Sequence, residues 1–221
     1  MKKLIIYIII CIIIILLRNN ICFFLGNVTG LFKLDNNYYE GIIKLKEEEI
    51  KYLKNEIDNI NEFSKNLPRI KYTYKVSKII YKESYNIGKY RVQYGKNDNV
   101  KIGYAVMNEY GLIGKITKVD ESTSELTTLK NLKDISVVIN GIYGKLNYDY
   151  ETNKYIVTDI SNYDKVYINN EVYTSGYGTI KENIYIGKVV KIENDTISKK
   201  VYIDINDNYD NLNYLLIVGD F

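Results

Sequence analysis

The chain has 221 residues, with 30 basic and 27 acidic side chains, a formal net charge of +3 and no histidine. The near balance of charge gives no electrostatic case for nucleic-acid binding, and without histidine no Ser-His-Asp or Cys-His pair can form. The two cysteines, Cys11 and Cys22, lie in or beside the apolar N-terminus, so we expect no disulfide, catalytic thiol, metal site or cofactor.

The first segment, residues 1–27, combines a charged tip with apolar runs. Two lysines precede the unbroken apolar run Leu4–Leu17, and a second short run, Ile21–Leu25, follows. As a helix, residues 4–25 would span about 33 Å, roughly the thickness of a hydrocarbon core. The segment predicts a single transmembrane helix, and the two lysines place its N-terminus in the cytoplasm. The rest of the chain is then extracytoplasmic.

A cleaved signal peptide is the alternative interpretation of this segment. Signal peptides end in a small-residue cleavage site, and the nearest match here is Val28-Thr29-Gly30, well past the polar break at Arg18. An arginine at that position could reach the outer headgroups. We therefore favour an uncleaved anchor.

Residues 31–67 carry apolar side chains at heptad spacing. With isoleucines at position a, most d positions are also apolar, and Glu49 and Lys54 could pair between chains. The pattern predicts a coiled-coil helix that joins two parallel chains in a homodimer, although Lys46 at d and Ser64 at a weaken it. A single amphipathic helix packed on its own domain is the alternative. The predicted dimer seam consists of Tyr39, Ile43, Ile50, Leu53, Ile57 and Ile60.

The periodicity changes after Pro68, which is expected to end the helix. From residue 71 to 221, apolar and tyrosine-rich runs alternate with a period of two, as in Val201, Ile203 and Ile205. Gly, Asn and Asp turns separate these runs at short intervals. This pattern predicts an all-β sandwich or barrel.

A weak internal repeat runs through the β region. Gly114–Val119 matches Gly187–Ile192, and upstream Val100–Val106 parallels Val166–Val172. The repeat predicts two related β units with a boundary near residues 145–165. Gly114 and Gly187 should then occupy equivalent places, each at a turn, a bulge or a close backbone approach.

The extra residues of the second copy include the bend Thr174-Ser175-Gly176. Without histidine to activate it, Ser175 is better interpreted as a turn residue that hydrogen-bonds local backbone. A hydrolase using Ser-Lys or paired carboxylates is a rival. The carboxylate pairs, Asp149 with Glu151 and Asp204 with Asp207, lie in or beside turn-rich segments, which favours solvated turns.

Two blocks resemble the bacterial rod shape-determining protein MreC family. The first, VKIGYAVMNEYGLIGKITKVDESTSELTTL, spans Val100–Leu129, and the second, EVYTSGYGTIKENIYIGKVVKI, spans Glu171–Ile192. The resemblance extends from Val76 to about Val218. The matching motif residues are Gly103, Gly111, Leu112, Ile113, Gly114, Thr174, Ser175, Gly176, Ile186 and Gly187.

The chain departs from the family pattern in two turns. Ile180–Asn183 replaces the usual Phe-Pro-x-Gly, and Lys130 and Asn131 follow Leu129 where an Asp is usual. Both departures affect loop shape more than fold.

The resemblance implies a mainly β fold with an N-terminal helix: one transmembrane helix, a coiled-coil helix, then two small barrels of the six-stranded type. It also implies a non-enzymatic, membrane-anchored scaffold of the cell-elongation and peptidoglycan-synthesis machinery, which forms and maintains cell shape. The implied partners are a second copy of the chain, an MreD-like membrane protein, an MreB-type cytoskeleton and peptidoglycan synthases. A membrane-fusion or efflux adaptor is the rival, but it needs two antiparallel helical arms with β segments on both sides.

Overall fold

The computed structural model describes residues 2–65, 67, 70–82, 88–206 and 212–221, and before residue 38 it describes only some of the side chains. The chain divides into two compact units, Met1–Asn59 and Ile60–Phe221. Pro68, which was expected to end the helix, lies outside the described residues.

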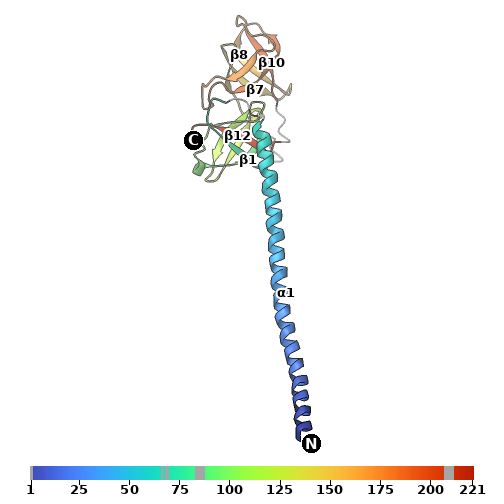
Figure 1. Ribbon diagram of the computed structural model, residues 1–221. Coiled ribbons are helices and arrows are strands. Elements are labelled where there is room, and N and C mark those ends of the chain that lie inside the picture. The colour runs from blue at the N-terminus through green and yellow to red at the C-terminus, as the bar shows by residue number, and fades with distance from the viewer. Residues whose placement is uncertain (1, 66, 68–69, 83–87, 207–211) are drawn as a thin grey trace. The chain divides into compact units, whose positions relative to one another are not determined.

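A single helix, α1 (Lys2–Lys65), runs through the whole first unit (Figure 1). The sequence predicted an anchor and a coiled-coil helix as separate segments, whereas α1 is continuous over 64 residues. In the described part of the chain, no helical stretch combines the length and hydropathy needed to cross a membrane.

The first barrel is closed by a strand from the end of the chain. Its hydrogen-bonded circuit runs β1-β12-β3-β4-β5-β2, with every neighbouring pair antiparallel. The short 3-10 helix η1 (Lys96–Asp98) follows β2. The strands are β1 (Tyr74–Lys82), β2 (Lys89–Gln93), β3 (Ala105–Met107), β4 (Leu112–Val119), β5 (Thr123–Thr128) and β12 (Tyr214–Val218).

The second barrel is built from one continuous stretch. After the 3-10 helix η2 (Leu129–Asn131), six consecutive strands close in the order β10-β11-β8-β7-β6-β9, again all antiparallel. The prediction of two six-stranded barrels is therefore confirmed. The strands are β6 (Ile135–Ile139), β7 (Ile142–Asp149), β8 (Lys154–Ser161), β9 (Glu171–Thr174), β10 (Tyr185–Asn194) and β11 (Ser198–Asp204).

The internal repeat corresponds to equivalent strand pairs. Val106 of β3 pairs with Gly114 of β4, and Val172 of β9 pairs with Gly187 of β10. A Cβ atom at Gly114 would collide with the carbonyl oxygen of Thr127, and one at Gly187 with that of Asp204. Glycine is therefore needed at both places because a neighbouring backbone lies too close for a side chain.

The second barrel is an insertion in the first. The predicted boundary near residues 145–165 instead falls within β7 and β8, inside the second barrel. Starting from β3 and from β9, the two circuits match strand for strand, with β12 in the place of β6. The first barrel is thus a circular permutation of the second, and the chain ends beside the first barrel (Figure 1).

Strand β12 is buried on both faces. Leu215 and Ile217 point into the core of the first barrel, whereas Leu216 and Val218 join the apolar cluster that fills the second barrel. All five residues of β12 are buried. An unbroken apolar run such as YLLIV is expected where a strand has no solvent face. Because Leu216 and Val218 of β12 belong to the cluster of the second barrel, that single apolar cluster joins the two barrels.

The last turns of α1 belong to the second unit. The ring centroid of Phe63 lies 6.2 Å from that of Tyr214 in β12. Phe63, Leu67 and Ile70 all pack against the apolar cluster that joins the barrels. The chain entering β1 is therefore held at the junction of the barrels.

Candidate functional site

Two motif glycines of the first barrel face the second barrel. Gly103 has φ +92°, and a Cβ there would lie 2.5 Å from the side chain of Thr179. Gly111 has φ +145°, and a Cβ there would lie 2.7 Å from the carbonyl oxygen of Tyr185. Both need glycine for conformation and for space, so this part of the motif is structural at the barrel junction.

The turn that carries Gly111 is fixed by a buried asparagine. The Oδ1 atom of Asn108 accepts hydrogen bonds from the backbone N–H groups of Tyr110 (2.9 Å) and Gly111 (3.1 Å). This is an Asx-type turn, in which the side chain replaces a backbone acceptor. Asn108 was not predicted from the sequence as a site residue, although Asn-x-x-Gly between two strands signals such a turn.

The residues that follow Gly111 alternate between the two cores. Leu112 belongs to the cluster that joins the barrels, and Ile113 to the core of the first barrel. Ile186, beside Gly187 in β10, lies in the joining cluster. These apolar motif residues are all buried, so they are packing positions.

The Thr174-Ser175-Gly176 bend is organised by hydrogen bonds. Thr174 Oγ1 donates to the carbonyl oxygen of Lys181 (2.6 Å) and accepts from the N–H of Ile184 (2.9 Å). Ser175 Oγ lies 2.7 Å from Ser136 Oγ and accepts from the N–H of Tyr177 (3.1 Å), and Gly176 has φ +80°. Thr174 and Ser175 thus shape the loop after β9.

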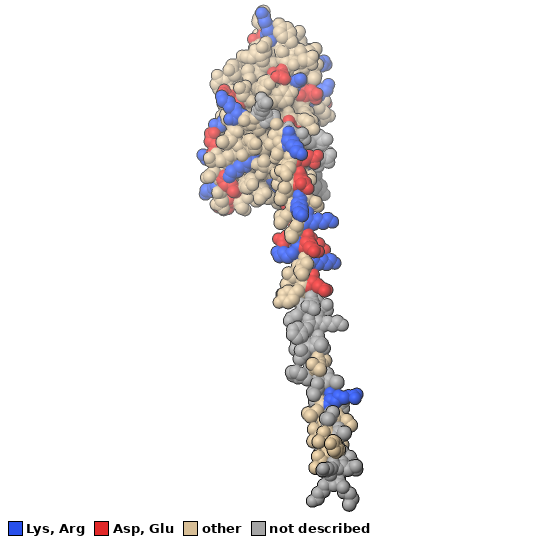
Figure 2. Space-filling model, in the orientation of Figure 1, with Lys and Arg blue, Asp and Glu red and all other residues tan. Residues whose placement is uncertain are grey.

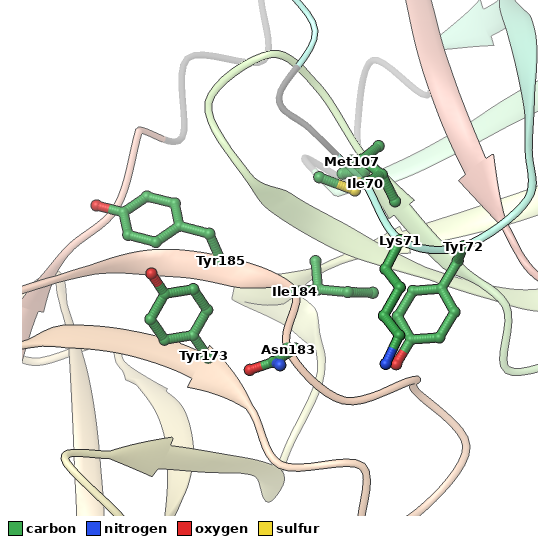
Figure 3. Close-up of a pocket in the computed structure, with 8 residues that line it drawn as sticks. All are labelled: Ile70, Lys71, Tyr72, Met107, Tyr173, Asn183, Ile184 and Tyr185. Carbon is green, nitrogen blue, oxygen red and sulfur yellow. The ribbon is translucent and has the colours of Figure 1, made fainter.

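Beside this loop lies the junction pocket, a cavity of about 480 Å³ between the barrels and the segment that precedes β1. Its lining comes from residues 70–72, from Met107, from Tyr173 and from residues 183–185; Figure 3 shows these side chains. Its floor includes Met107 and Ile184, each only 3% exposed. The lining residues are Ile70, Lys71, Tyr72, Met107, Tyr173, Asn183, Ile184 and Tyr185.

Two of the three tyrosines that line the pocket, Tyr173 and Tyr185, remain neutral. The Tyr173 hydroxyl donates a 2.6 Å hydrogen bond to Glu171 Oε2, which together with burial and the carboxylate charge raises the pKa of Tyr173 to about 12. Burial, followed by the charges of Glu171 and Asp204, also raises the pKa of Tyr185. The two rings pack edge to face with centroids 5.6 Å apart. The lining side chains at this end of the pocket are therefore aromatic and neutral, with the Glu171 carboxylate hydrogen-bonded to one of them.

Two lysines differ in their partners at the other end, where Lys71 lines the pocket and Lys181 lies outside the lining. Lys181 Nζ lies 2.6 Å from Asp220 Oδ2, and this hydrogen bond raises the pKa of Lys181. Lys181 also lies 5.9 Å from the ring centroid of Tyr72. Lys71, by contrast, has no hydrogen bond or ion pair with any residue in the described part of the chain.

The candidate chemical residues lie at strand ends and in the turns beside them: Asp149 ends β7 and Asp204 ends β11. Asp149 accepts hydrogen bonds from Thr152 Oγ1 and from the N–H of Glu151, which lower the pKa of Asp149. Asp207 lies outside the described residues. Over the described ranges, no three Cys, Asp or Glu side chains gather as a metal site would need.

The predicted dimer seam lies on α1. Five of its residues have exposed side chains, and Ile60, where the second unit begins, is partly buried. The five exposed seam residues are Tyr39, Ile43, Ile50, Leu53 and Ile57.

On the face of the barrels shown in Figure 2, basic and acidic side chains are interspersed, with no patch of one sign.

A family model described as the barrel core of the rod shape-determining protein MreC matches residues 79–219. The cell shape-determining protein MreC of Listeria monocytogenes is 27% identical over 216 residues, covering 89% of this chain and 73% of the relative.

Solved structures share the fold. A structure of MreC from Listeria monocytogenes superposes with a TM-score of 0.61 and 24% identity, covering 82% of this chain and 94% of that one. MreC from Helicobacter pylori, solved in complex with a penicillin-binding protein (PBP2), gives a TM-score of 0.55 and 19% identity, covering 68% of this chain and all of that one.

Proposed function

The chain belongs to the MreC family of rod shape-determining proteins, and from this premise we propose that it is a non-enzymatic scaffold of the machinery that builds the cell wall during elongation. The family match over residues 79–219, which takes in the second barrel and all of the first except the start of β1, carries the proposal. The serine at the bend supports it too, because Ser175 is hydrogen-bonded to Ser136 and to a backbone N–H.

The proposed partner class is a peptidoglycan synthase. The relative from Helicobacter pylori was solved in complex with a penicillin-binding protein. By analogy, this chain binds a penicillin-binding protein of its own cell through the barrel unit. The mixed charge on the face in Figure 2 favours a protein partner over a polyanion, which would need a basic face. An MreD-like membrane protein and an MreB-type cytoskeleton complete the expected assembly.

We further propose that residues 1–27 anchor the chain, with the barrels outside the cytoplasm. The support is the apolar run Leu4–Leu17 behind two lysines. A cysteine at exposed Ser198, in a chain whose two native cysteines are replaced by serine, should react with a membrane-impermeant maleimide in intact cells. Protection in intact cells with reaction after lysis would refute this topology.

A parallel homodimer through α1 is the third part of the proposal. Ile50 and Ile57 are exposed and lie one heptad apart on the helix. In the same cysteine-free chain, Ile50→Cys should give a disulfide-linked dimer when membranes are oxidised. Lys51→Cys, one position off the seam, is the matched control. Failure at both Ile50 and Ile57 would contradict the parallel register.

The scaffold role is tested by depletion in the native cell. Cells that lose the protein should become rounder, and labelled wall precursors should no longer be inserted along the side wall. Re-expression of the full chain should restore both. Unchanged shape with a defect in export would instead favour the membrane-fusion or efflux adaptor.

A further inference from the structure

The junction pocket has the features of a binding site for a short peptide. Its volume of about 480 Å³ falls within the range of pockets that bury small ligands, which is roughly 300–1,000 Å³. That volume accepts a short segment of chain but not a folded domain. It is lined by both barrels and by the segment before β1, so binding there would depend on the relative position of all three.

The floor of the pocket can receive one apolar side chain. Met107 ends β3 in the first barrel, and Ile184 precedes β10 in the second. Both belong to the cluster that joins the barrels. Methionine is unbranched and adaptable, so it can accommodate side chains of different shape. The edge-to-face tyrosines, Tyr173 and Tyr185, close the far end with neutral rings.

The charges of the pocket favour a carboxylate on the ligand. Lys71 lines the pocket and has no ion pair within the described part of the chain. The nearby Lys181 is already paired with Asp220, and the carboxylate of Glu171 accepts the Tyr173 hydroxyl. One lysine with no ion pair to a described residue suits one carboxylate, whereas a polyanion would need several cations.

We propose that the junction pocket binds a peptide segment of a partner protein in which an apolar residue is followed by an acidic one. The apolar side chain rests on Met107 and Ile184, and the carboxylate pairs with Lys71, which lines the same pocket (Figure 3). The proposal rests on the proposed scaffold function, since it assigns the chemistry by which a partner would be recognised.

Methionine provides a direct probe, because Met107 lines the pocket and the sequence contains one other methionine, Met1. The full chain, in detergent micelles, is labelled with ¹³C at the methionine methyl groups and titrated with acetyl-Leu-Glu-amide. The Met107 signal should move in a saturable way while the Met1 signal stays in place. The amide analogue, acetyl-Leu-Gln-amide, should bind about tenfold more weakly because it lacks the charge. Equal binding of both peptides, or no shift at millimolar concentration, would overturn the proposal.

A substitution separates this proposal from the scaffold function. Lys71→Gln should bring the acidic peptide down to the affinity of its amide analogue. Lys133→Gln is the matched control, because Lys133 is also exposed but lies outside the pocket. If Lys71→Gln leaves the affinity for the acidic peptide unchanged, the pocket assignment fails. The depletion experiment tests the scaffold function independently, so the two can fail separately.

Discussion

The two barrels follow the same circuit of strands but assemble it from different parts of the chain. The second barrel uses six consecutive strands, β6 to β11, whereas the first lacks its last strand until β12 is added after the second is complete. Contacts within the second barrel are therefore closer in sequence. The first barrel must close a loop that contains a whole domain, and closing long loops slows folding.

The barrels also differ in how they are covered. The second barrel fills its interior with its own side chains, including Val137, Val157 and Val201. The first barrel has a core of its own and also apolar side chains on its outer face, such as Leu112 and Leu216, which pack at the junction. The second barrel should thus fold alone, whereas the first depends on its partner.

The largest expected effect comes from a charge in β12. Leu215 is fully buried in the core of the first barrel, so Leu215→Asp should destabilise that barrel by more than about 4 kcal/mol. The second barrel should stay folded. Hydrogen exchange read by mass spectrometry should show lost protection in residues 74–128 and 214–218 and retained protection in residues 135–204.

The matched control is Val137→Asp in β6, which occupies the equivalent place in the second circuit. This change should unfold the second barrel and also weaken the first, which loses the cover of its outer apolar face. Symmetrical results, with each substitution unfolding only its own barrel, would contradict the dependence of the first barrel on the second.

A smaller effect is expected at the two equivalent glycines of the repeat, and it tests whether both contribute equally to the stability of their barrels. Gly114→Ala and Gly187→Ala each force a methyl group against a backbone carbonyl oxygen. Each should lower the free energy of unfolding of its own barrel by about 2–3 kcal/mol, measured by denaturant unfolding followed by exchange. Gly41→Ala, on the helix with no atom within 4 Å of the added Cβ, should instead stabilise by up to about 1 kcal/mol. A neutral result at either barrel glycine would refute the close approach.

Much of the fold was predictable because strands obey local rules. The change to a period of two located the β region, and the repeated glycines identified β4 and β10 as equivalent strands. The insertion of the second barrel into the first was not predictable, because the local sequence YLLIV does not indicate which barrel the strand completes. The pairing of β12 with β1 and β3 is a long-range contact that depends on burial. The repeat therefore gave the wrong position for the boundary between the barrels.

The candidate site was only partly predictable. The motif glycines Gly103 and Gly111 were identified from the sequence, but their position facing the second barrel was not predicted. The pocket was missed because its lining comes from segments far apart in sequence, such as Lys71 and Tyr185. A lone lysine before a strand is typical of a solvated residue, and only the fold places it at a cavity.

The close contact between the barrels can be tested at Gly111. Gly111→Ala combines a strained positive φ with a methyl group 2.7 Å from the Tyr185 carbonyl oxygen. Gly178→Ala is the control, because its φ is +113° but no atom lies within 4 Å of the added Cβ. Both should lose about 1–3 kcal/mol from the strained backbone, and Gly111→Ala should lose more. Only Gly111→Ala should also move the ¹³C-methyl signal of Met107. Equal losses, with that signal unmoved, would show that the barrels do not meet closely at Gly111.

The smallest effect is expected at the ion pair that joins the barrels. Lys181, before β10, pairs with Asp220, after β12, and both side chains are open to water. Such pairs contribute little to stability and are screened by salt. Lys181→Met should therefore lower the thermal midpoint less than any other destabilising variant above, and the difference should vanish in about 1 M salt. Lys188→Met, at an exposed lysine of β10 that lies outside the junction pocket, is the control. A large loss that persists in high salt would mean that charge, rather than the apolar cluster around β12, holds the first barrel to the second.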